Sequence, residues 1–130
     1  MIGLDTNVLV RYFTQDDTAQ AAAANELIDQ LTELRPGYVT MIVIVETYWV
    51  LSRAYRTDQT AVAATLRGLL DAKEVVVERA DLVRRALRRM ADGADFADAL
   101  ISEAGADAGC ERTVTFDRRA AKPAGMQLLA

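Results

Sequence analysis

The sequence predicts an α/β fold, a three-layer arrangement in which a mainly parallel sheet of four or five strands is flanked by helices. Short apolar segments alternate along the chain with longer segments of helical periodicity, which is the pattern of consecutive βα units. Both prolines and four of the seven glycines fall where elements should end, and no linker or repeat marks a second domain. A chain of 130 residues can bury one core without disulfides or zinc, so we expect a single domain over residues 1–130.

The beginning of the chain predicts a short buried strand and two helices. Residues 2–4 have strand character, and residues 6–13 carry apolar side chains at helical spacing. Asp17 or Thr18 can cap a second helix, which runs through four consecutive alanines to about residue 34.

Residues 38–55 combine two patterns. The composition of residues 38–45 is typical of a strand, yet from Ile44 onward the apolar side chains recur at helical spacing. We expect a strand over residues 38–40 and then a helix over residues 41–55.

The second half continues the alternation of strands and helices. Helices are predicted over residues 58–72, 81–92 and 96–108, and strands over residues 75–77, 113–116 and 126–129. The helix over residues 81–92 is amphipathic, with one apolar and one basic face. The basic face consists of Arg84, Arg85, Arg88 and Arg89.

Composition excludes several kinds of chemistry. The chain has no histidine and one cysteine, Cys110, so it has no Ser-His-Asp or Cys-His pair, no histidine-ligated metal and no intrachain disulfide. Its 19 acidic and 15 basic residues give a net charge of −4, which argues against coating nucleic acid by bulk positive charge. We expect Cys110 to be a small buried side chain.

The sequence predicts a cytoplasmic protein with no membrane partner. The first four residues lead directly to Asp5, without the basic region and long apolar stretch of a signal peptide. The longest apolar run, residues 41–45, is far shorter than the roughly 20 residues that span a bilayer.

Four acidic residues are expected near the carboxyl ends of the strands, where ligands gather in parallel α/β sheets. They are Asp5 after the first strand, Glu46 in the helix after the second, Asp98 opening a helix, and Asp117 after the fourth strand. Taken alone, each aspartate is also a good helix cap or first-turn acid. Glu46 stands among apolar neighbours, so it lies either at an exposed margin or in a site that needs its charge.

A cluster of such carboxylates favours a bound cation. Two carboxylates about 4 Å apart repel by roughly 4 kcal/mol at an effective dielectric of about 20, so they must protonate, separate or bind a cation. Oxygen ligands without histidine suit Mg²⁺, for which Mn²⁺ can substitute, better than zinc or copper. Because Mg²⁺ commonly works with substrate phosphates, we expect phosphodiester hydrolysis or phosphoryl transfer.

Four segments resemble those of PIN-domain ribonucleases of the VapC toxin type. They are DTNVLV at residues 5–10, Thr40 six residues before Glu46, DFADALI at residues 95–101, and TVTFD at residues 113–117. The resemblance covers nearly the whole chain, with the segments in the expected order and spacing.

This resemblance implies a Mg²⁺-dependent endoribonuclease, the toxin of a toxin-antitoxin pair, which cleaves RNA and leaves a 5′-phosphate. It further implies a homodimer inhibited by a cognate VapB-type antitoxin. Tyr12 and Phe13 could join a groove for that antitoxin with the apolar side of the second helix. A water bound to the metal would take the place of a histidine base.

The resemblance also implies roles for individual residues. Asp5 and Asp98 would be the principal Mg²⁺ ligands, and Glu46 and Asp117 would complete the acidic pocket. The residues expected to orient these carboxylates or a metal-bound water are Thr6, Asn7 and Thr115, with Asp95 as a helix cap or supporting group.

The arginines have two interpretations. Arg118 and Arg119 directly follow Asp117, and they would either bind RNA beside the pocket or pair with its acids. The basic face of residues 81–92 could steer RNA phosphates, although charged helix faces are often only solvated surface.

Two other functions stay open from sequence alone. A Mg²⁺-dependent phosphotransferase or receiver-like domain also places an aspartate after its first strand, but a haloacid-dehalogenase-like phosphatase would need a second aspartate where Asn7 stands. The other alternative is a non-catalytic PIN-like binding module, against which the presence of all four acids argues.

Overall fold

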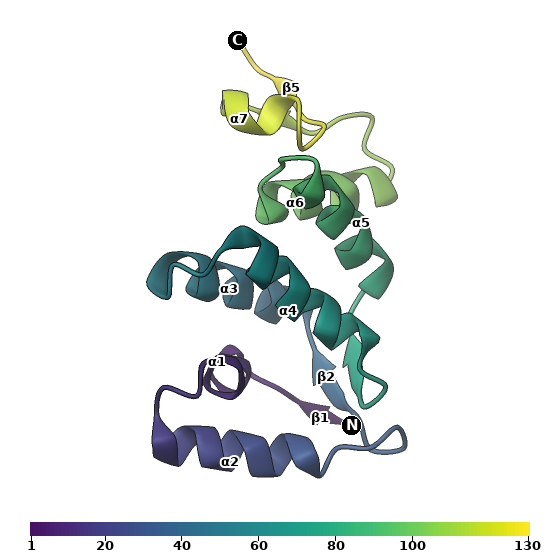
Figure 1. Ribbon diagram of the computed structural model, residues 1–130. Helices are drawn as coiled ribbons and strands as arrows, with labels where there is room; N and C mark the ends of the chain where they lie inside the picture. Colours follow the sequence, from purple (N-terminus) through teal and green to yellow (C-terminus); the bar gives the residue numbers. More distant parts are fainter. The chain divides into compact units, whose positions relative to one another are not determined.

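The computed structural model describes all 130 residues and divides them into two compact units, residues 1–78 and residues 79–130 (Figure 1). It contains five strands, three in the sheet of the first unit and two in the sheet of the second, and every pairing is parallel. Helices alternate with these strands along the chain. The predicted α/β class with parallel strands is therefore confirmed.

The sheet of the first unit has the order β1-β2-β3, with β1 at Ile2–Gly3, β2 at Gly37–Val39 and β3 at Val75–Val77. Gly37 is paired on both sides, with Ile2 and with Val75. A Cβ at this position would lie 2.8 Å from Leu4 Cδ1, so glycine allows the core side chains to approach the central strand.

The helices of the first unit begin at side-chain caps. They are α1 at Thr6–Thr14, α2 at Thr18–Asp29, α3 at Met41–Trp49 and α4 at Gln59–Asp71. The caps are Asp5, Asp17, Thr40 and Asp58, each accepting a hydrogen bond from a backbone N–H of the first turn. No helix of the chain is both long and apolar enough to cross a membrane.

Two predicted helices differ from the observed ones in their second halves. The helix predicted to about residue 34 ends at Asp29, because Thr32 forms a turn with Arg35 through its N–H and its hydroxyl, and Pro36 disfavours helical backbone before it. The helix predicted over residues 41–55 changes at Val50 into a π-helix, η1, at Val50–Ala54. There Tyr55 N–H donates to the Val50 carbonyl at 3.2 Å.

The core of the first unit is built from side chains of its sheet and helices. Those that are almost completely buried are Leu9 of α1, Val39 of β2, Ile44 of α3, and Val62 and Leu66 of α4. Helix α3 buries Val43, Ile44, Thr47 and Tyr48, which recur at helical spacing, whereas Ile42 within the apolar run of residues 41–45 is exposed.

The second unit contains α5 at Ala80–Ala91, α6 at Phe96–Asp107, β4 at Val114–Thr115, α7 at Arg118–Ala121 and β5 at Gln127–Leu128. Helices α5 and α6 pack against each other (Figure 1). The short helix α7 was absent from the sequence prediction. Cys110, predicted to be buried, is exposed because it follows the turn at Gly109 after α6.

Candidate metal centre

In the first unit, Thr6 links the turn after β1 to α3. Asp5 follows β1 and caps α1, accepting a hydrogen bond from Thr6 N–H at Oδ1 over 2.8 Å. The Thr6 hydroxyl donates to Glu46 Oε1 over 2.7 Å. Thr6 is buried, whereas Asp5 and Glu46 are exposed. Each of these two carboxylates has a second oxygen without a hydrogen bond to protein, which can face a cation.

Asn7 lies at the same end of α1 and is among the residues that line two open cavities. One has a volume of about 240 Å³ between α1 and η1, and the other about 300 Å³ between α1 and α2. Arg11, one turn further along α1, lines both.

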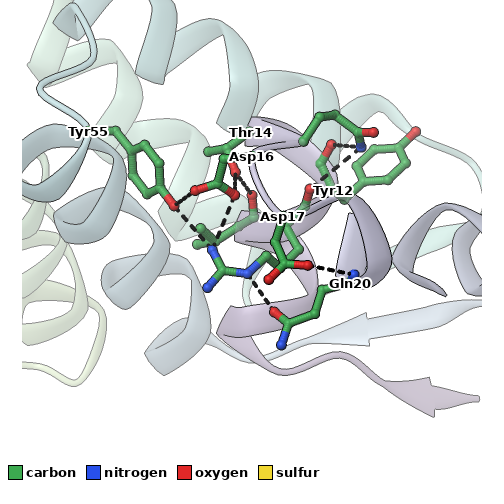
Figure 2. A network of polar contacts seen from close by, with 9 residues as sticks. Tyr12, Thr14, Asp16, Asp17, Gln20 and Tyr55 are labelled. Atoms are coloured by element: carbon green, nitrogen blue, oxygen red, sulfur yellow. Dashed lines mark hydrogen bonds and ion pairs between the residues drawn. The ribbon is translucent and has the colours of Figure 1, made fainter. Parts of the chain in front are cut away.

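A polar network holds Arg11 and ties α1 to η1 (Figure 2). The Arg11 guanidinium donates to Asp16, Gln20 and Tyr55, the last at 3.1 Å. The Tyr55 hydroxyl donates to Asp16 Oδ2 at 2.6 Å, and the Thr14 hydroxyl to Asp16 Oδ1 at 2.9 Å. The hydrogen bond to Tyr55 is the largest cause that raises the pKa of Arg11 and lowers the pKa of Asp16. The network therefore holds the C-terminal half of α1 and the loop after it against Tyr55.

In the second unit, α6 begins with two acidic residues that interact. Asp95 caps the helix by accepting a hydrogen bond from Asp98 N–H over 3.0 Å. Partial burial raises the pKa of Asp98, and the negative charges of Asp95 and Asp117 raise it further, while Arg119 opposes them. Asp98 is thus a half-buried carboxylate in an acidic environment.

Asp117 follows β4 and caps the short helix α7. Its Oδ1 accepts hydrogen bonds from Arg119 N–H at 2.9 Å and from Arg119 Nε at 3.3 Å, and these bonds lower the pKa of Asp117. The Thr115 hydroxyl accepts a hydrogen bond from Asp117 N–H at 3.0 Å. Thr115 therefore holds the backbone at Asp117, and Arg119 forms an ion pair with an acid of the candidate site.

The donor set fits a hard divalent cation. Every candidate ligand supplies carboxylate oxygen, and the repulsion acting on Asp98 is of the kind that a bound cation relieves. No group of three or more acidic or cysteine side chains is already positioned to hold a metal ion. The structure places Asp5, Thr6 and Glu46 together in the first unit, and Asp95, Asp98 and Asp117 within electrostatic range in the second.

These features define an α/β protein in which Asp5 and Asp117 follow parallel strands and cap the next helices, while Glu46 lies within α3 and Asp98 in the first turn of α6. The model of the PIN domain family matches residues 2–126, and the chain therefore belongs to that family. PIN domains are generally metal-dependent nucleases. No curated protein matches the chain in sequence.

Two features of the site could not be predicted from the sequence. The hydrogen bond between Thr6 and Glu46 joins residues 40 positions apart, and no periodicity reports such a contact. The network around Arg11 was missed as well, although a basic residue followed by Asp16 at a helix end was a partial signal.

Proposed function

We propose that the chain is a Mg²⁺-dependent endoribonuclease that acts as the toxin of a toxin-antitoxin pair. The observation that carries the proposal is the PIN match over residues 2–126, because that segment contains all four candidate carboxylates. The all-oxygen donor set supports Mg²⁺, with Mn²⁺ as a substitute. The absence of histidine supports a mechanism without an imidazole base.

In this proposal Asp5 and Asp98 are the principal metal ligands, and Glu46 and Asp117 complete the acidic pocket. A bound Mg²⁺ supplies charge neutralisation on the phosphoryl oxygens and activation of water for attack on phosphorus. Neighbouring residues of the chain orient the carboxylates that would bind the metal.

Three contacts orient the proposed ligands. Thr6 holds one oxygen of Glu46, which leaves the other available. Asp95 holds the first turn of α6 and so positions Asp98. Arg119 fixes Asp117 and offsets its charge. Such supporting contacts commonly change metal affinity or activity by roughly 10–100-fold when they are removed.

A groove of the first unit supports the proposed antitoxin partner. A cavity of about 350 Å³ is lined mainly by apolar side chains, among them Tyr12 and Phe13 of α1, Ile28 of α2 and Leu69 of α4. An apolar segment of a VapB-type antitoxin would fit such a surface. The homodimer rests on the resemblance to VapC-type toxins, and a cytoplasmic location is part of the same proposal.

The first experiment is cleavage of total RNA by the purified chain with Mg²⁺, with Mn²⁺ or with EDTA. We expect metal-dependent cuts that leave 5′-phosphate ends, and loss of cleavage in Asp5→Asn and Asp98→Asn. Glu26→Gln is the matched control because Glu26 is an exposed acid of α2 outside the site. Cleavage that persists in EDTA or in Asp98→Asn would contradict the proposal, and a stable aspartyl-phosphate at Asp5 would favour phosphotransfer.

The toxin role needs a separate test. Expression of the chain alone should arrest growth, and Asp98→Asn should remove the arrest. Co-expression with the product of a small upstream reading frame that overlaps this one should restore growth. Normal growth under wild-type expression, together with active nuclease in the extract, would contradict the toxin role but not the nuclease.

A further inference from the structure

The acidic excess of the chain belongs to its first unit. Residues 1–78 contain six basic and eleven acidic side chains, a net charge of −5, whereas residues 79–130 contain nine basic and eight acidic ones, a net charge of +1. The overall charge of −4 therefore conceals a unit that is slightly basic. A polyanion would be attracted more strongly to the second unit than to the first.

Helix α5 concentrates this positive charge. Four of its twelve residues are arginines within a span of six positions, and its only acidic residue is Asp81 in the first turn. The opposite face is fixed by burial, since Leu82, Val83, Ala86 and Leu87 are at most 2% exposed. Burial of one face holds the arginine side chains on the other.

Some arginines of this region are already engaged. Arg79, just before α5, forms ion pairs with Asp81 and Asp107 at 3.0 and 2.9 Å. Arg89 pairs with Glu103 at 2.6 Å, and its guanidinium lies against Gly125, where a Cβ would be 2.7 Å from Nη1. These two side chains brace the ends of the helix and are not available for a ligand.

Arg85 and Arg88 differ from them. Both are exposed and neither forms an ion pair, although Arg85 lies near enough to Asp107 to help lower the pKa of that carboxyl, whose ion pair is with Arg79. Three residues of α-helix separate them by about 4.5 Å along the axis, so both guanidinium groups can reach one stretch of a polyanion. Guanidinium groups bind phosphate oxygens in a bidentate manner.

We propose that Arg85 and Arg88 of α5 form a docking surface for the phosphate backbone of the RNA substrate. The inference rests on the proposed ribonuclease function and assigns part of the substrate affinity to the basic side of the second unit. Charge complementarity favours RNA over an apolar partner, because the surface offers two unpaired cations on a helix whose position is fixed by its buried face.

The test compares RNA binding by the wild-type chain and by the double variant Arg85→Gln/Arg88→Gln. Binding of a fluorescent single-stranded RNA is measured in EDTA, where no metal-dependent cleavage occurs, over a series of salt concentrations. Each lost phosphate contact should reduce the slope of log K against log salt by about 0.7, so the double variant should lose about 1.4. We expect its affinity at low salt to fall about tenfold or more.

A matched control is Arg35→Gln/Arg67→Gln, which removes two exposed arginines from the first unit. The control should retain the wild-type slope. An unchanged slope in the α5 variant, or an equal loss in both variants, would overturn the inference. A change in oligomeric state on size-exclusion chromatography with unchanged RNA binding would also overturn it, because the face would then contact a second copy.

Measurements of RNA cleavage distinguish the docking surface on α5 from the proposed ribonuclease activity. With Mg²⁺, the α5 variant should cleave a long RNA with a lower kcat/KM, through a higher KM, and a short oligonucleotide at the wild-type rate. If the wild-type chain binds RNA through α5 but does not cleave it, the ribonuclease proposal fails while the docking surface stands. Equal melting temperatures of wild type and variant verify that the fold is retained.

Discussion

Asp98 is the acidic residue whose surroundings most oppose its charge. Partial burial and the charges of Asp95 and Asp117 raise its pKa. The ionised carboxylate is therefore less stable in the folded protein than in the unfolded chain. For an acid with a raised pKa, the cost to stability is present above that pKa and is relieved as the pH falls through it. The residue thus combines a proposed role as ligand with a cost to folding.

We therefore predict that Asp98→Asn melts at a higher temperature than the wild-type chain at pH 7 in EDTA, by at most a few degrees. The difference should shrink as the pH falls through the raised pKa of Asp98, because the wild-type carboxyl then takes up a proton. Thermal unfolding followed by circular dichroism measures both effects. Asp117→Asn is the opposite control, since its pKa is lowered by Arg119 and its loss should destabilise the chain. A lower melting temperature for Asp98→Asn at pH 7 would contradict this account.

At the residue scale, the sequence predicted which acids to consider but not their contacts. Asp5, Asp95 and Asp117 were recognisable as caps because Asp before a helix has a local signature. The bond from Thr6 to Glu46 depends on the packing of α1 with α3, which no local pattern encodes. The roles of these residues in metal binding remain predictions.

At the scale of elements, the segment from α3 to Tyr55 is joined by hydrogen bonds to α1 and to the loop that follows α1. Its π-helix delivers the Tyr55 hydroxyl to Asp16 and Arg11, which belong to the loop after α1 and to α1 itself (Figure 2). We predict that Tyr55→Phe lowers the melting temperature at pH 7, because both hydrogen bonds are lost while the ring is retained.

The pH dependence of that variant follows from Asp16. The Tyr55 hydrogen bond lowers the pKa of Asp16, so the stability it contributes is present above the unfolded pKa and is lost as the pH falls through the folded one. The difference between wild type and Tyr55→Phe should therefore be full at pH 7 and shrink below about pH 4. A difference that is constant between pH 7 and pH 3 would show that the variant changes packing and that the hydrogen bond from Tyr55 to Asp16 does not contribute.

Most elements were predicted within one or two residues, and the errors have identifiable causes. The boundaries of α1, α4 and α6 follow from caps and periodicity, and those of α5, which has no side-chain cap, from periodicity alone; both signals act locally. The early end of α2 depends on a side-chain turn at Thr32, and the π-helix on a change of hydrogen-bond register at Val50. Helix α7 has only four residues, too few for periodicity to reveal.

At the scale of the whole molecule, the charge of the chain is unevenly divided. The first unit carries the acidic excess, and the second carries the arginines of α5. Net charge alone is therefore a poor predictor of the affinity of such a chain for nucleic acid, because electrostatic attraction depends on where the charges lie. The PIN match extends over residues of both units, so the proposed function belongs to the whole chain.

Thermal unfolding in the presence of Mg²⁺ tests whether residues of both units are needed for metal binding. A ligand that binds only the folded state adds stability of about 2.7 kcal/mol when its concentration is about 100 times its Kd. We expect Mg²⁺ to raise the melting temperature of the wild-type chain, and EDTA to reverse the rise. Asp5→Asn in the first unit and Asp98→Asn in the second should each abolish it, whereas Glu26→Gln should keep it. If only one of the two variants loses the response, the metal is held by a single unit and the proposed set of ligands is wrong.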